Sequence, residues 1–470
     1  MKKYTLYIAL LLIGAVGLAQ NKPLLYGYED IPQSLLLNPA ADMPQGLHVG
    51  IPFASHLYVH AGSSGVSVYD IFKDQQGIND RVTAAIFDLK ASDFFTANQQ
   101  LELINFGWKS KQSNNYYSGG IYQELDVMAY FPKDLAILAW EGNRNYIGKS
   151  FDLGELSVTG EALTVFHFGV SKKMSKKLRL GARAKIYSSI AHFSSTGNKG
   201  TFTTNLGDGS ENIYQHLISG ANINVKTSGI NALGDAESGS ETVSQFVKRA
   251  MLGGNLGLGV DLGMSYDFDK HWTLDASILD LGAVFHTNDV ERYESKGDFT
   301  LNGIELIFPP LSEGQETIDY YTGITDRFDQ EIPRDTITSG YVQLRPIKLN
   351  GALTYGFGEL SEGEDCNCLN KEDTRWREGV GAHFYSIMRP KRPQFAFSVF
   401  YFRRLTSFLS AKVAYTWDEY SANNLGMGIN ADLGWVNFYL MTDNILRYGN
   451  LAKAKNVSLQ LGLNLKINKQ

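Results

Sequence analysis

The last stretch of the chain alternates strictly between aliphatic and polar residues. From residue 457 to residue 467 every second position is aliphatic, and the positions between them are polar or glycine. Successive side chains of a β-strand point to opposite faces, so this stretch is predicted to be a strand with one apolar face. Either a protein core or membrane hydrocarbon must cover that face. The face consists of Val457, Leu459, Leu461, Leu463, Leu465 and Ile467.

The same alternation recurs along the chain, at residues 178–187, 256–268 and 425–433. These strands come in pairs separated by short polar turns, as at residues 164–187, 263–279 and 393–417, which predicts antiparallel hairpins. Much longer polar stretches separate the pairs, near residues 192–250, 286–341 and 358–378. Short turns on one side and long loops on the other are typical of an outer-membrane barrel.

A soluble β-sandwich is the competing interpretation, because its strands also alternate. Three features favour the membrane barrel. The predicted strands exceed the five or six residues usual in globular sheets. Their polar faces carry glycine and charge, and aromatic residues such as Tyr266, Phe268 and Trp272 gather near strand ends, as in interfacial girdles. The prediction is a single-domain, all-β, antiparallel transmembrane barrel at residues 46–470.

Charged residues on the alternating strands are expected to face the lumen. A charge against lipid near the midplane would cost several kcal/mol, so the polar face of each strand has to point inward. The predicted lumen-facing residues are Arg179, Arg183, Lys185, Asp261, Asp267, Asp275 and Asp432.

The first 19 residues have the pattern of a cleaved secretory signal peptide. Lys2 and Lys3 precede an apolar run from Leu6 to Leu18, and the small residue Ala19 stands before a plausible cleavage site. The protein is therefore expected to be exported to the outer membrane. No later apolar run reaches 18 residues, and the formal charge of -6 argues against nucleic acid as a partner.

Two segments do not fit the strand pattern. Residues 132–143 begin with proline, end with Gly-Asn and carry apolar residues on one helical face, which predicts a short helix. Residues 31–46 contain three prolines and cannot form a central strand, so they are expected to tuck into the barrel as a plug.

No motif indicates catalysis, a cofactor or a metal. The chain has no Gly-x-Ser-x-Gly elbow, and the glycine-rich residues 257–263 continue as a strand instead of turning into a helix. Cys366 and Cys368 lie in a polar, turn-like stretch, where they form either a local disulfide or two free thiols. The protein is expected not to be an enzyme.

Several short motifs resemble the FadL and PorV-like superfamily of outer-membrane barrels. They are the box Asn38-Pro39-Ala40, the strand residues Asp261 and Gly263 followed by Asp280-Leu281-Gly282, and residues 442–446 before the closing strand. Together with residues 131–143, they are most similar to an uncharacterised sister family of exported barrels. The resemblance implies about fourteen strands and an N-terminal hatch at about residues 20–45. It also implies that the barrel-insertion machinery recognises the C-terminal strand, although the usual final aromatic residue is missing here.

The resemblance leaves two functions open. The first is a passive conduit for a small hydrophobic or amphipathic ligand. The alternative is a PorV-like, non-transporting subunit that docks partners of an outer-membrane assembly or secretion complex. A shared fold does not decide between these roles. The expected partners are outer-membrane lipid, the insertion machinery and, in the alternative, other proteins of such a complex.

Overall fold

The computed structural model describes residues 22–74, 77–113, 115–207, 213–236, 238–302, 320–359 and 376–467. The predicted signal peptide, residues 1–19, and the pair Cys366 and Cys368 lie outside the described residues.

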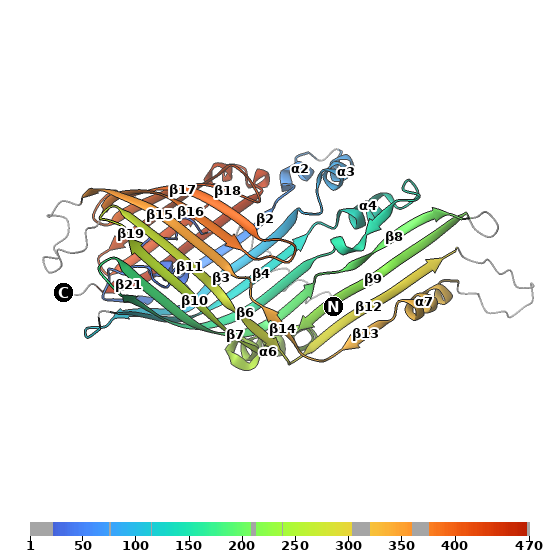
Figure 1. Ribbon diagram of the computed structural model, residues 1–470, viewed down its shortest axis with the longest axis horizontal. Helices are drawn as coiled ribbons and strands as arrows, with labels where there is room; N and C mark the ends of the chain where they lie inside the picture. The colour runs from blue at the N-terminus through green and yellow to red at the C-terminus, as the bar shows by residue number, and fades with distance from the viewer. Residues whose placement is uncertain are drawn as a thin grey trace, which may run out of the picture.

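The described strands form a closed antiparallel barrel with fourteen strand positions (Figure 1). The ring closes where β21 pairs with β1 and β2, which together occupy one position. β14 and β15 likewise share a position beside β11. The barrel strands are β1 (Leu47–Gly50), β2 (Leu57–Ser63), β3 (Phe94–Lys109), β4 (Tyr116–Tyr130), β6 (Val158–Lys173), β7 (Leu178–Ser195), β10 (Asn255–Asp267), β11 (Trp272–His286), β14 (Tyr341–Leu344), β15 (Lys348–Glu359), β16 (Trp376–Ile387), β17 (Gln394–Arg404), β18 (Leu409–Asp418), β19 (Asn424–Leu433), β20 (Val436–Thr442) and β21 (Asn456–Ile467).

The closing strand β21 shows which of its two alternating faces points into the barrel. Its polar residues Ser458, Gln460 and Asn464 are buried inside the ring, whereas its aliphatic residues are partly exposed on the outside. This is the reverse of a soluble protein, and it suits a wall with lipid outside. Closure also removes the sheet edges, so backbone groups do not remain unpaired in hydrocarbon. The predicted transmembrane barrel and its strand count are therefore confirmed.

Most long connections leave one end of the barrel, and the short turns lie at the other end (Figure 1). The predicted loop near residues 358–378 is an exception. It joins β15 to β16 beyond Tyr355, the register partner of Trp272 just after the β10–β11 turn, so it leaves the barrel at the turn end. The three hairpins predicted from the sequence are present as β6–β7, β10–β11 and β17–β18. The predicted short helix is α4 (Lys133–Glu141), at the long-connection end. In the described part of the chain, no helix has the length and apolar character needed to cross a membrane.

The long connections contain regular structure that the alternation did not predict. The barrel sheet continues beyond the ring through the pairing of β7 with β9, and this outer sheet also contains the paired strands β5, β8, β12 and β13. Its strands are β5 (Ser150–Asp152), β8 (Lys199–Leu206), β9 (Tyr214–Ser228), β12 (Val290–Leu301) and β13 (Arg334–Ile337). The helices are α2 (Val68–Phe72), α3 (Ile78–Asp88), α5 (Ile230–Gly234), α6 (Gly239–Lys248) and α7 (Tyr320–Glu331), with short turns η2 (Leu153–Glu155), η3 (Arg249–Gly253), η4 (Ile445–Arg447) and η5 (Leu451–Lys453). Stretches expected to be loops therefore form an outer sheet.

Residues 22–45, here called the N-terminal segment, run through the interior of the ring. The segment contains the short 3-10 helix η1 (Pro32–Leu36), which is buried throughout. Side chains from strands far apart around the wall donate hydrogen bonds to its backbone carbonyls. The donors are Lys412 of β18 to Tyr26 (2.7 Å), Lys466 of β21 to Asp30 (2.7 Å), Arg183 of β7 to Leu36 (2.8 Å) and Ser277 of β11 to Leu37 (2.6 Å).

Candidate functional site

The box Asn38-Pro39-Ala40 lies directly against the barrel wall. Its neighbours there are Gly181 of β7 and Gly263 of β10, which are register partners in adjacent strands. A Cβ on Gly181 would lie 2.2 Å from the carbonyl carbon of Pro39, and one on Gly263 would lie 2.1 Å from Asn38 Oδ1. The two glycines are therefore what lets the box approach the wall so closely.

The box is also held by hydrogen bonds. Asn38 Nδ2 donates to the carbonyl of Met264 in β10 (3.3 Å), and the backbone N–H of Ala40 donates to Asn38 Oδ1 (3.0 Å). The second bond spans two residues, which is the Asx turn that asparagine favours. The Asn-Pro-Ala order therefore serves local geometry as well as packing.

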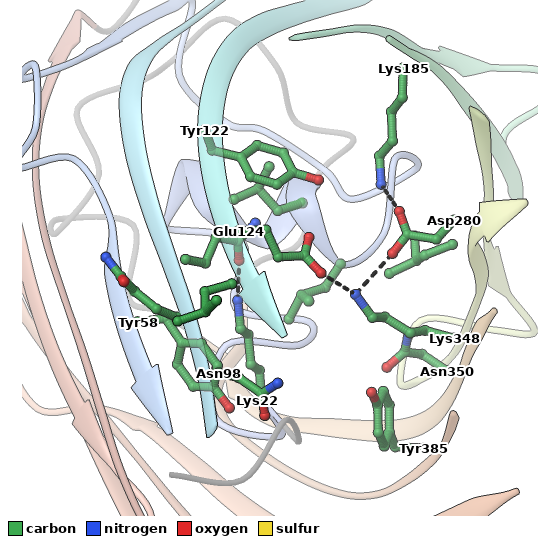
Figure 2. Close-up of a pocket in the computed structure, with 16 residues that line it drawn as sticks. Lys22, Tyr58, Asn98, Tyr122, Glu124, Lys185, Asp280, Lys348, Asn350 and Tyr385 are labelled. Carbon is green, nitrogen blue, oxygen red and sulfur yellow. Dashed lines mark hydrogen bonds and ion pairs between the residues drawn. The ribbon is translucent and has the colours of Figure 1, made fainter. Parts of the chain in front are cut away.

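Beyond the box, a chain of ion pairs starts on β7, continues over β10, β11 and β15, crosses the lumen to β4 and ends on β6, the neighbour of β7. The cations alternate with the carboxylates and equal them in number, so each buried charge has a partner of opposite sign, as burial requires. The contacts are Arg183–Asp261 (2.8 Å), Lys185–Asp261 (2.8 Å), Lys185–Asp280 (2.6 Å), Lys348–Asp280 (2.9 Å), Lys348–Glu124 (3.3 Å), Arg345–Glu124 (3.0 Å) and Arg345–Glu161. Figure 2 shows the middle of this chain, where Asp280 and Glu124 converge on Lys348.

A β-bulge in β11 brings Asp280 into this chain. The register between β10 and β11 shifts here, and Asp280 takes a positive φ of 61°, a conformation in which Asp and Asn are enriched. Leu279 and Asp280 are consequently both buried. The backbone N–H of Asp280 donates to Asp261 Oδ1 (2.7 Å), so Asp261 fixes the bulge as well as two cations.

A cavity of about 60 Å³ lies between the N-terminal segment and the wall (Figure 2). Since a water needs roughly 10–15 Å³ measured in this way, the cavity has room for a few waters or one small group. Its lining is mixed, with leucine and tyrosine side chains beside charged and amide groups. The lining residues used below are Lys22, Leu36, Tyr58, Tyr122, Leu279 and Lys348.

Lys22 differs from the other charged residues of the lining in the partners of its ammonium group. Its ammonium donates to Gln100 Oε1, lies 3.4 Å from His56 Nε2 and sits 4.2 Å from the centre of the Tyr58 ring. Among the described residues, no carboxylate oxygen lies within 4.0 Å of Lys22 Nζ. The cavity thus contains a buried cation without an acidic partner, unlike the neighbouring ion-pair chain.

The other predicted lumen residues lie nearer the turn end of the barrel. Arg179 pairs with Asp42 of the N-terminal segment (2.6 Å). Asp275 lies beside the segment near Gly27, and Asp432 pairs with Lys466 (2.5 Å).

Asp267 has the same parity as Asp261 but ends β10, so it is exposed and accepts a hydrogen bond from Thr273. In the described ranges, no group of three or more His, Cys, Asp or Glu residues is placed to hold a metal.

Several interior charges were not identified from the sequence. Glu124 alternates with Tyr122 and Asp126 on the inner face of β4, a signal that was present but interrupted by apolar and amide neighbours. Arg345 lies in the break between β14 and β15, just before Pro346, where no periodicity exists. Lys348 opens β15, so its face becomes apparent only from the pairing with β11.

A family model described as "Family of unknown function (DUF5723)" matches residues 39–443, from within the Asn-Pro-Ala box to the end of β20. The chain belongs to the DUF5723 family. The match includes both glycines that receive the box and every member of the ion-pair chain. No curated protein matches the chain significantly in sequence.

Solved structures similar to this DUF5723 chain include outer-membrane channels. The toluene transporter TodX of Pseudomonas putida is 8% identical, over 95% of this chain and 94% of that chain, with a TM-score of 0.38. The CymD monoaromatic hydrocarbon channel is 9% identical, over 94% of each chain, with a TM-score of 0.39. A FadL homologue of Pseudomonas aeruginosa is 11% identical, over 96% and 97%, with a TM-score of 0.38. At TM-scores this low, function has to be argued from the barrel's own geometry.

Proposed function

We propose that this protein is a non-enzymatic outer-membrane conduit in which the N-terminal segment closes the passage of a small amphipathic ligand. The observation that carries the proposal is the cavity, which is lined by the segment on one side and by the wall on the other. Because the segment runs through the lumen, a shift of the segment would connect this cavity to the ends of the barrel.

The contacts of the segment suit a part that moves as a unit. The wall holds it through four side-chain donors to its backbone carbonyls and through side-chain contacts, which include Arg404–Asp30 (2.7 Å), Arg179–Asp42 (2.6 Å) and Gln33–Asn464 (2.8 Å). The box rests on two glycines without a covalent link. A bond from a charged donor, as at Lys412, Lys466 and Arg183, contributes roughly 1.5–3 kcal/mol, and the neutral Ser277 bond contributes roughly 0.5–1.5 kcal/mol. These contacts are non-covalent and can be broken and formed again, so the closure is reversible.

The cavity lining indicates the class of ligand. Leu36 and Leu279 offer apolar contact, whereas Lys22 offers a cation with no acidic partner in the described part of the chain. A buried charge without a partner is costly, and a bound carboxylate would relieve that cost. A small monocarboxylate with a short apolar tail satisfies both parts of the lining.

The contact between the box and Gly181 provides the test. Gly181→Ala places a Cβ 2.2 Å from Pro39 and should dislodge the box, so proteoliposomes should swell faster in butyrate than with the wild type. Gly351→Ala is the matched control, because a Cβ on that strand glycine meets nothing within 4 Å. Folding of each variant is checked by the mobility difference between boiled and unboiled samples. Equal swelling of Gly181→Ala and the wild type would contradict the proposed closure.

Selectivity is tested on the same vesicles. Lys22→Gln in the Gly181→Ala background should lower the swelling rate in butyrate while leaving the rate in an uncharged solute of similar size unchanged. If both rates fell together, Lys22 would not recognise the carboxylate, although the passage itself would stand.

A further inference from the structure

Helix α6 turns its apolar side chains away from the rest of the protein. Val243, Phe246 and Val247 are 63%, 39% and 52% exposed, and their spacing places them on one face. Thr242 and Gln245 are the less exposed residues and occupy the face toward the protein. A surface helix normally buries its apolar stripe and exposes its polar residues, so the arrangement here is inverted.

The helix is fixed outside the barrel wall by the turn that follows it. In η3, Arg249 Nε donates to the carbonyl of Ile190 (2.7 Å), and Ser188 Oγ donates to the carbonyl of Arg249 (2.6 Å). Both partners belong to β7. Figure 1 shows α6 projecting from the outside of the ring beside this strand, toward the long-connection end.

The apolar face of α6 continues into the lipid-facing wall. Met251 and Leu252 of η3 are 54% and 46% exposed, and the next strand, β10, starts its outward row with Leu256 and Leu258. Neighbouring strands extend this surface at the same end, through the register pair Phe285–Val342 among others. Exposed apolar side chains thus continue along the chain from α6 through η3 to the outward row of β10.

We propose that α6 lies in the membrane interface at the long-connection end of the barrel, with Val243, Phe246 and Val247 in contact with lipid acyl chains. The apolar face of α6 is continuous along the chain with the outer wall, and that wall already faces hydrocarbon. Lipid is therefore the occupant that we expect on this face. Ser244 and Lys248 lie on the third side of the helix, toward water and headgroups. An inverted apolar face beside a charged one is what an interfacial helix requires.

The test uses a polarity-sensitive fluorophore on single cysteines, with Cys366 and Cys368 first replaced by serine. Val243→Cys carries the label on the apolar face, and Ser244→Cys, one residue further, is the matched control on the water side. In proteoliposomes, the label at 243 should be blue-shifted, quenched by lipids with a spin label on the acyl chain and shielded from iodide. The label at 244 should show the opposite pattern.

Two results would overturn the proposal. Equal iodide quenching at both positions would show that the apolar face is in water. Shielding of position 243 from iodide without quenching by the spin-labelled lipids would show that protein covers the face, and a dependence on the protein-to-lipid ratio would identify that protein as a second copy of the chain.

Discussion

Removal of the Asp261 carboxylate should destabilise the barrel more than any loss of a surface charge. Asp261 is fully buried, pairs with Arg183 and Lys185 at 2.8 Å each and accepts the Asp280 backbone N–H at 2.7 Å. Breaking a buried ion pair by removing one partner costs about 3–5 kcal/mol, because the other charge stays buried. Asp261→Ala removes the carboxylate that pairs with Arg183, leaves Lys185 with Asp280 alone and removes the acceptor of the Asp280 N–H, so a loss within that range is expected.

The assay is guanidinium chloride unfolding of barrels folded in lipid vesicles, followed by tryptophan fluorescence. Arg392→Gln is the surface control, because the Arg392–Glu419 pair is 48% and 21% exposed and should contribute less than about 1 kcal/mol.

A double variant removes a positive charge together with the Asp261 carboxylate. Asp261→Ala combined with Lys185→Met should cost less than the sum of the single changes, by about 0.5–3 kcal/mol, because it restores charge balance. If Asp261→Ala and Arg392→Gln lost equal amounts, the buried ion-pair chain would not stabilise the lumen as described.

Two further substitutions test the outer face and an end of the barrel. Leu461→Arg places a cation on the lipid side of β21 and should cost about 2–4 kcal/mol, lowering the fraction that shows heat-modifiable mobility, whereas Leu461→Met should fold normally. Burial raises the pKa of Asp443, in the connection after β20, to about 7 from a usual 3.8. The native state then binds more protons than the unfolded chain between these values, so the free energy of unfolding should fall as pH rises through that range, and Asp443→Asn should flatten the dependence. A dependence unchanged in Asp443→Asn would assign it to other groups.

Alternation determines which face of a strand each residue occupies, and this much could be predicted from the sequence. Arg183 and Lys185 share the polar face of β7, and Asp261 shares that of β10, so their inward direction follows from a period of two. The contact of Arg183 and Lys185 with Asp261 does not follow from this period. β7 pairs with β10 across the connection that holds β8, β9 and α6, and no local pattern specifies so distant a partner.

The two-residue period of a strand gives the wrong direction for the Asp280 side chain. By parity with Ser277 and Leu279, Asp280 would face lipid, yet the bulge turns it inward to bind Lys185 and Lys348. A bulge adds one residue to one strand and leaves little trace in composition. The outer strands were not predicted either, because their apolar residues, such as Ala221 and Phe299, are sparse and do not form a strictly alternating row.

The placement of the N-terminal segment inside the barrel is tested most directly by a cross-link between two introduced cysteines. Ser277 Oγ lies 2.6 Å from the Leu37 carbonyl oxygen, which places the two Cα atoms within about 7.5 Å of each other. Once Cys366 and Cys368 are replaced by serine, cysteines at positions 37 and 277 are within reach of a short bis-maleimide. The account predicts that the bis-maleimide cross-links Leu37→Cys to Ser277→Cys in membranes, whereas it does not cross-link Leu37→Cys to Ile278→Cys, on the lipid face of the same strand. Cross-linking to position 278, or to neither position in folded protein, would contradict it.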